Sequence, residues 1–126
     1  MILDKCRDKN ELYDLFINRP MDDGIFDFDF ICNNPHLYCF YDEKEGFLRG
    51  YINVYKDELK RLFLSGASVR KNMPENINAI IMVCDAYDED MYSETDKKEA
   101  KICLLKAGFK KIKDNLYVRY KNGEKQ

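Results

Sequence analysis

The clearest pattern of apolar and polar positions along this chain lies between residues 37 and 67. Three runs rich in aromatic and β-branched residues are separated there by two polar turn segments, Lys44-Glu45-Gly46 and Lys56-Asp57-Glu58. The runs cover residues 37–43, 47–55 and 59–67. Together they predict three strands joined as a meander.

Three other segments carry apolar residues at helical spacing and have start or stop signals. The first covers residues 9–18, opens with the capping box Asp8-Lys9-Asn10-Glu11 and stops before Pro20. The second runs from Asn72, whose cap has a glutamate three residues on, to about Tyr87. The third begins after Asp96 as its cap and stops at Gly108. The pattern therefore predicts three helices.

The remaining segments predict shorter strands. Residues 1–6 suit an edge strand, residues 91–95 a short strand, and residues 110–120 one or two strands around Asp114-Asn115. Three phenylalanines at positions 26, 28 and 30 alternate with aspartates, which is a strand-like period over residues 26–30. The order of all these elements predicts an α+β fold with about three helices.

Composition limits the class of protein. A chain of 126 residues without an internal linker is expected to fold as one domain over residues 1–126. A net charge of -2 argues against nucleic acid as a partner, and the apolar runs are too short for a membrane helix. Five cysteines without metal-type spacing, and no signal segment, favour reduced thiols and a cytoplasmic protein. The aspartates of residues 22–29 lack the spacing of a calcium loop, so no metal is expected.

The C-terminal third resembles a known superfamily. Tyr92-Ser93-Glu94-Thr95, then Ala100, then Leu104 to Phe109 are similar to the last strand, helix and Gly-Phe ending of the GNAT N-acetyltransferases. In element order the resemblance covers nearly the whole chain, and in recognisable letters it covers residues 91–120. It implies a GNAT-like fold, in which a mixed and mainly antiparallel central sheet is flanked by about three helices in a three-layer arrangement. It also implies acetyl-coenzyme A as the cofactor of an N-acetyltransferase.

The resemblance also implies where acetyl-coenzyme A would lie. In the family it occupies a splay between the fourth and fifth strands. The backbone of residues 64–68 would therefore face its pantetheine, and the binding residues there would be Leu64, Gly66 and Ser68. A basic, glycine-containing loop at a helix start holds the pyrophosphate in the family, because free N–H groups bind an anion there. Here Arg70 and Lys71 supply the charge, but glycine is absent, and Asn72 and Glu75 are placed to cap the helix themselves.

Acetyl transfer also needs a base for the amine and an acid for the leaving thiolate. The family often uses a glutamate near the fourth strand, and Glu58 stands there; the alternative is a carboxylate in a solvated turn. The family's tyrosine, four residues before the Gly of Gly-Phe, falls on Leu104, and its asparagine at the helix start falls on Lys97. Leucine cannot donate a proton. Tyr92 and Tyr87 are candidate substitutes, or else packing residues.

Two functions stay open. The first is an acyltransferase that takes a coenzyme A thioester, with eroded catalytic motifs; it requires an open cleft near residues 62–68 and 91–95. The second is a structural or binding protein without chemistry. The chain resembles small GNAT-like bacteriophage proteins in its short length and in the spacing around Asn34-Pro35 and Ser65-Gly66. Some of those proteins are linked with the virion or head assembly. Its partner would be a protein or the assembling virion, bound by the aromatic and acidic residues 20–41. Its cleft would be closed or filled by side chains.

Overall fold

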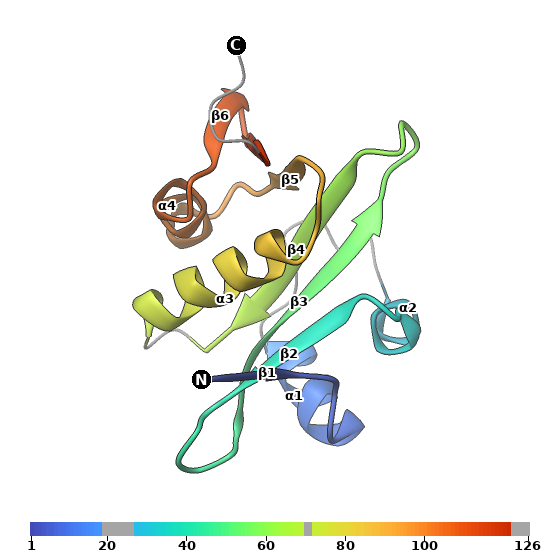
Figure 1. The fold of residues 1–126 in the computed structure, drawn as a ribbon. Coiled ribbons are helices and arrows are strands. Elements are labelled where there is room, and N and C mark those ends of the chain that lie inside the picture. Colours follow the sequence, from blue (N-terminus) through green and yellow to red (C-terminus); the bar gives the residue numbers. More distant parts are fainter. Residues whose placement is uncertain (19–26, 70–71, 122–126) are drawn as a thin grey trace.

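The computed structural model describes residues 1–18, 27–69 and 72–121 of the chain. These ranges contain seven strands, which are β1 (Ile2–Asp4), β2 (Leu37–Tyr41), β3 (Leu48–Lys56), β4 (Leu62–Ser68), β5 (Met91–Glu94), β6 (Lys110–Lys113) and β7 (Leu116–Arg119). They also contain four helices, which are α1 (Lys9–Asn18), α2 (Phe28–Asn33), α3 (Met73–Asp85) and α4 (Lys98–Lys106). The fold is mixed α+β, as predicted (Figure 1).

The strands form one sheet in the order β1-β2-β3-β4-β5-β7-β6. All neighbours in this sheet are antiparallel except β4 and β5, which are parallel. The predicted meander is confirmed as β2, β3 and β4, and residues 110–120 form the hairpin β6–β7. The sheet is therefore mainly antiparallel, with its one parallel contact near the middle.

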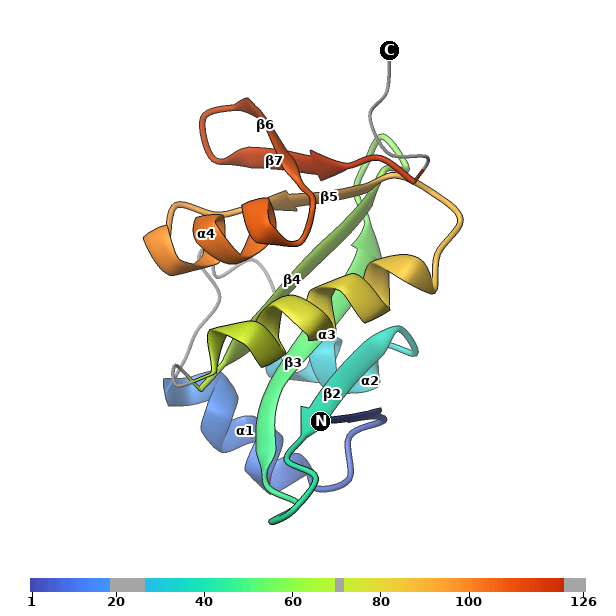
Figure 2. The ribbon, with the colours of Figure 1, turned by 60° about the vertical axis from the view of Figure 1, so that its left-hand side comes forward.

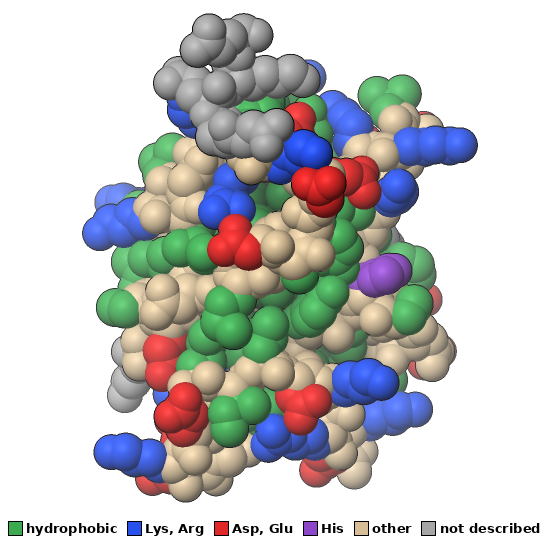
Figure 3. Space-filling model, viewed as in Figure 1, with side chains coloured by type: hydrophobic (Ala, Val, Ile, Leu, Met, Phe, Trp, Pro, Cys, Tyr) green, Lys and Arg blue, Asp and Glu red, His purple; other side chains and the backbone are tan. Residues whose placement is uncertain are grey.

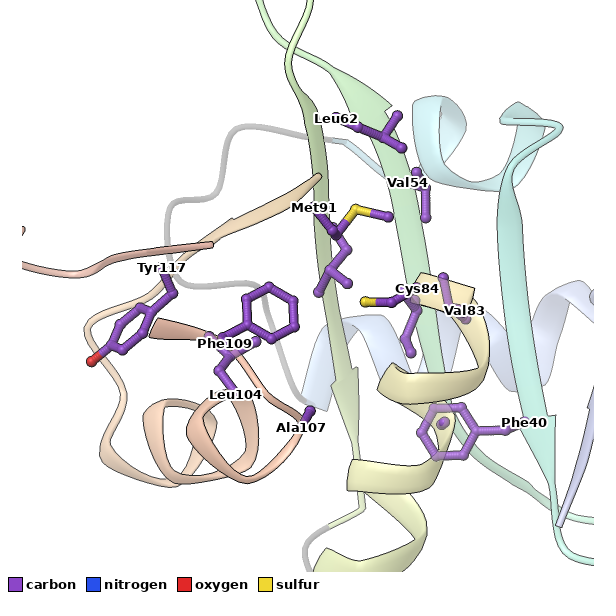
Figure 4. Close-up of a cluster of buried hydrophobic side chains, with 13 residues drawn as sticks. Phe40, Val54, Leu62, Val83, Cys84, Met91, Leu104, Ala107, Phe109 and Tyr117 are labelled. Carbon is purple, nitrogen blue, oxygen red and sulfur yellow. The ribbon is translucent and has the colours of Figure 1, made fainter. Parts of the chain in front are cut away.

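The helices form two layers, one on each side of this sheet (Figures 1 and 2). On β3 the side chain of Tyr51 belongs to one buried cluster, and those of Ile52 and Val54 belong to another, because successive side chains of a strand point to opposite faces. The first cluster contains Leu12 of α1 and Ile31 of α2. The second cluster, drawn in Figure 4, joins side chains of α3 and α4 to the other face of the sheet.

The helix α2 replaces the strand that was predicted over residues 26–30, so that prediction is wrong for the described part of this segment. Asp27 caps the helix, because its side-chain oxygen accepts a hydrogen bond from the N–H of Phe30 at 2.8 Å. Phe28 packs against Tyr13 and Phe16 of α1, with ring centroids 5.0 and 5.7 Å apart. The number of helices is therefore four and not about three.

Local hydrogen bonds explain where β4 begins. The run from residue 59 was predicted as strand, but β4 starts only at Leu62. The side chain of Asp57 accepts hydrogen bonds from the N–H groups of Leu59 and Arg61, at 3.1 and 2.8 Å, which closes a turn over these residues. Lys60 takes a positive φ of 62° inside that turn.

The ends of the helices follow the predicted signals in part. The side chain of Asp8 accepts from the N–H of Asn10 at 2.9 Å, whereas Glu11 accepts from Leu48 on β3, at 2.8 Å. Asp96 was predicted as the cap of α4, and this prediction is wrong. The cap is Lys97, which makes no side-chain capping bond. Gly108 follows α4 with a φ of 99°, as expected for a helix stop.

No helix in the described part of the chain is long and apolar enough to cross a bilayer. All five cysteines lie within the described ranges, and each is a free thiol.

Candidate functional site

A cavity of about 440 Å³ lies where β4 and β5 separate, and it is the main candidate site in the described residues. The two strands pair only at their beginnings, where Leu62 faces Met91 and Phe63 faces Tyr92. Beyond these two pairs, β4 continues to Ser68 without a register partner on β5. Helices α3 and α4 supply the other walls of the cavity. Its volume lies within the range of about 300 to 1,000 Å³ that is typical of small-molecule sites.

The edge of β4 gives this cavity a wall of backbone groups. The Oγ of Ser93 donates a hydrogen bond to the carbonyl oxygen of Leu64 at 2.9 Å, so the backbone groups of Leu64 point toward β5. Because this direction alternates along a strand, the N–H and C=O groups of Gly66 and Ser68 point the same way. These residues all line the cavity. The site therefore offers strand-type hydrogen bonds to a ligand that carries amides.

The other walls of the cavity are mostly apolar. Phe40, Ile80 and Leu104 contribute hydrophobic side chains, and Asn76 and Ser93 contribute polar ones. Such a lining, with a few polar groups among apolar ones, is usual for sites that bind organic ligands.

One thiol also lines the cavity. Cys103 of α4 is 8% exposed, and burial raises the pKa of its thiol. The group is therefore a neutral thiol at neutral pH, and it contributes a weakly polar surface and no thiolate.

The first turn of α3, beside the cavity, has a side-chain cap from Asn72 and a proline at position 74. The side chain of Asn72 accepts a hydrogen bond from the N–H of Glu75 at 3.2 Å, and Pro74 has no N–H to offer. The carboxylate of Glu75 lies 2.6 Å from Nε of Arg49, a side chain that is only 10% exposed. Arg49 also lies 3.5 Å from Asp42, so both carboxylates share this guanidinium.

The described residues that line the cavity carry no excess of positive charge. Among its lining residues, Glu94 and Glu99 are acidic and Lys97 is basic. On the face of the molecule seen in Figure 3, lysine and arginine side chains are interspersed with aspartate and glutamate. The described part of the site therefore gives no electrostatic preference for an anion.

The structure brings together part of the residue set predicted from sequence. Leu64, Gly66 and Ser68 line the cavity. Arg70 and Lys71 lie outside the described residues.

Glu58 and Tyr92 do not line the cavity. Glu58 is exposed in the turn before β4. Tyr92 stacks on Phe63, with ring centroids 5.6 Å apart, and Arg61 lies 5.2 Å from its ring centre. Since the neighbours of Tyr92 on β5, Met91 and Ser93, face the second buried cluster and the cavity, the ring of Tyr92 lies on the opposite face of the sheet.

Leu104, at the position of the family's tyrosine, is 3% exposed and both lines the cavity and belongs to the hydrophobic core (Figure 4). It offers no proton to a leaving thiolate. Lys97, at the position of the family's asparagine, also lines the cavity.

Sequence reasoning did not single out several of the lining residues, among them Asn76, Ser93 and Cys103. Asn76 and Cys103 share their helices with apolar residues at core spacing, and Ser93 stands in a short strand, so nothing in their local pattern distinguishes them. For Ser93 the position along the strand is informative, because this residue follows the two residues of β5 that pair with β4 and so lies where the strands separate. In the described part of the chain, no group of three acidic, histidine or cysteine side chains is placed to hold a metal ion.

Comparison of the chain with protein-family models, with curated proteins and with solved structures gives no match. The candidate function has to be argued from the geometry of the cavity.

Proposed function

We propose that this chain is a GNAT-like domain that binds an acyl thioester of the coenzyme A class in the cavity between β4 and β5, as an acyltransferase does. The observation that carries the proposal is the separation of β4 from β5 after two residue pairs, with the cavity at that point. The resemblance to the GNAT superfamily implies its donor site between these same two strands. An acyltransferase requires an open cleft near residues 62–68 and 91–95, and a cavity at this place supports that function.

The fit of the donor rests on its pantetheine part. Pantetheine is an extended chain with two amide groups. The edge of β4 presents the backbone groups of Gly66 and Ser68 to the cavity, beside Leu64, whose carbonyl oxygen accepts from Ser93. Pairing of such amides with an open strand edge follows the same chemistry as the addition of a peptide strand. The acyl group would lie among the apolar side chains of Ile80 and Leu104.

The resident residues give less support for the chemical step. Leu104 cannot act as an acid, and neither Glu58 nor Tyr92 lines the cavity. A thioester-binding protein without turnover, such as a structural component of a bacteriophage virion, is therefore the second candidate. The apolar side chain at position 104 is the observation that favours it.

Calorimetric titration with acetyl-coenzyme A tests the binding. We expect a dissociation constant between roughly 1 and 100 μM, which corresponds to about -8 to -5 kcal/mol. Desulfo-coenzyme A serves as the analogue that lacks the thioester. An absence of heat up to millimolar acetyl-coenzyme A would contradict the proposal.

A substitution that fills the cavity should weaken this binding. Ala100 is half-buried on α4 and lines the cavity, so the added side chain of Ala100→Leu would occupy space that the ligand needs. We expect the dissociation constant to rise at least about tenfold, which is about 1.4 kcal/mol. Lys98→Leu is the matched control, because Lys98 is exposed on the same helix and the variant adds the same residue type. Equal affinities of the two variants would place the ligand elsewhere.

Turnover is measured separately, as thiol released from acetyl-coenzyme A in the presence of a panel of amines and lysine peptides. Release above the rate without protein supports the acyltransferase. Binding without release supports the non-catalytic candidate and leaves the donor site standing.

A further inference from the structure

We propose that the cavity recognises the acyl-pantetheine part of its thioester alone, so that the nucleotide diphosphate of coenzyme A adds nothing to the binding affinity. Its substrate class is then an S-acyl pantetheine, of which acetyl-coenzyme A is only one form. This inference rests on the proposed function, because it concerns the ligand of the same cavity.

The first argument is the state of the amides at the start of α3. A helix N-terminus binds a phosphate group through its free N–H groups and its dipole. Here the N–H of Glu75 already donates to the side chain of Asn72 at 3.2 Å, and Pro74 removes another donor. Two of the N–H positions of this turn, those of Pro74 and Glu75, are therefore not open to a diphosphate.

The second argument is charge. Glu75 places a carboxylate in this first turn of α3, and Glu99 does so in the first turn of α4. Both helices line the cavity, so each helix dipole there already has an anionic partner. Arg49, the buried cation beside α3, lies 2.6 Å from Glu75 and 3.5 Å from Asp42, and is therefore already paired.

The third argument is that the described contacts suit pantetheine without the nucleotide. The open backbone edge of β4 matches amides, and Ile80 and Leu104 match an acyl chain. Neither kind of contact involves a phosphate. The walls of the cavity therefore account for recognition of the pantetheine arm.

The test compares S-acetylpantetheine with acetyl-coenzyme A by calorimetry on the intact chain, in 50 and 500 mM sodium chloride. We expect dissociation constants that agree within threefold. We also expect less than twofold change with salt for both ligands, because the protein makes no charge contact with the phosphates that salt would screen. Acetyl-coenzyme A binding more than threefold tighter would overturn the inference and leave the proposed function intact. Failure of both ligands to bind would overturn both.

Two variants sharpen the comparison. Arg70→Ala with Lys71→Ala removes the basic residues that precede α3, and we expect affinity for acetyl-coenzyme A to change less than threefold. A larger loss would show that the nucleotide diphosphate is bound after all, and would overturn the inference.

Glu75→Gln removes the carboxylate at the start of α3 and releases Arg49 from it. We expect acetyl-coenzyme A to bind this variant more than threefold tighter, whereas the affinity for S-acetylpantetheine stays within twofold. Asp114→Asn is the control, since it removes one negative charge from the exposed β6–β7 turn. Unchanged affinity of Glu75→Gln for acetyl-coenzyme A would count against the inference.

Discussion

Gly66→Ala is expected to lower the free energy of unfolding by about 3 kcal/mol, because the new methyl group has no space. A Cβ on Gly66 would overlap the carbonyl oxygen of Tyr51 and would come within 3.1 Å of Cα of Ile52. Both are backbone atoms of β3, the strand that pairs with β4, so they cannot move aside without breaking the register. Urea denaturation followed by circular dichroism measures the loss.

Gly46→Ala is the control for this substitution. A Cβ on Gly46 meets nothing within 4 Å. The residue has a φ of 75°, however, and this backbone conformation is strained for any residue with an L side chain. We expect a loss of about 1 kcal/mol from that backbone conformation. If the two variants lost equal stability, backbone conformation and not the close approach of β3 and β4 would explain both glycines.

Leu12→Ala is expected to cost about 3 kcal/mol, the usual effect of removing a large buried aliphatic side chain and leaving a cavity. Leu12 of α1 is 0% exposed and belongs to the cluster that holds α1 and α2 against the sheet. The measurement is again the midpoint and slope of urea denaturation, read by far-ultraviolet circular dichroism.

The matched control is Ile17→Ala on the same helix, where the side chain is 52% exposed. We expect its effect to stay within about 0.5 kcal/mol. A small loss for Leu12→Ala, similar to that of the control, would mean that α1 adds little to the stability of the sheet.

Much of the fold could be predicted from sequence because strong local signals agree with the packing. The helix of residues 9–18 has its bounds in the structure as predicted, and the three strands between residues 37 and 67 have their apolar residues in two buried clusters. Gly108 stops α4 with a positive φ, as glycine at a helix end commonly does.

The errors arise where a short polar contact outweighs the apolar pattern. Phenylalanines at every second position suggested a strand, but the bond from the side chain of Asp27 to the N–H of Phe30 starts a helix instead. A six-residue helix is too short for its apolar spacing to be distinguished from a strand by period alone. In a similar way, the hydrogen bonds that Asp57 accepts in the turn make β4 start later along the chain than predicted.

The candidate site could be predicted only as far as it follows the strand β4. Leu64, Gly66 and Ser68 line the cavity because they continue β4 past its last partner on β5. Tyr92 was a less informative choice, because the face to which it points depends on the register of β5 with β4, two strands that are distant in sequence. Asn76 and Cys103 come to the cavity through the packing of α3 and α4, which no local pattern encodes.

The narrow connection between β4 and β5 also affects how the molecule opens. In the described residues, two register pairs, Leu62 with Met91 and Phe63 with Tyr92, join β1–β4 to β5–β7, and the Oγ of Ser93 adds one hydrogen bond to β4. The two parts are otherwise joined by side chains of the shared core, among them Val54 and Phe109. Amide hydrogens on β5 and β7 should therefore exchange with deuterium as a separate cooperative group from those on β2 and β3. A ligand on the open edge of β4 would bridge the two groups and slow their exchange together.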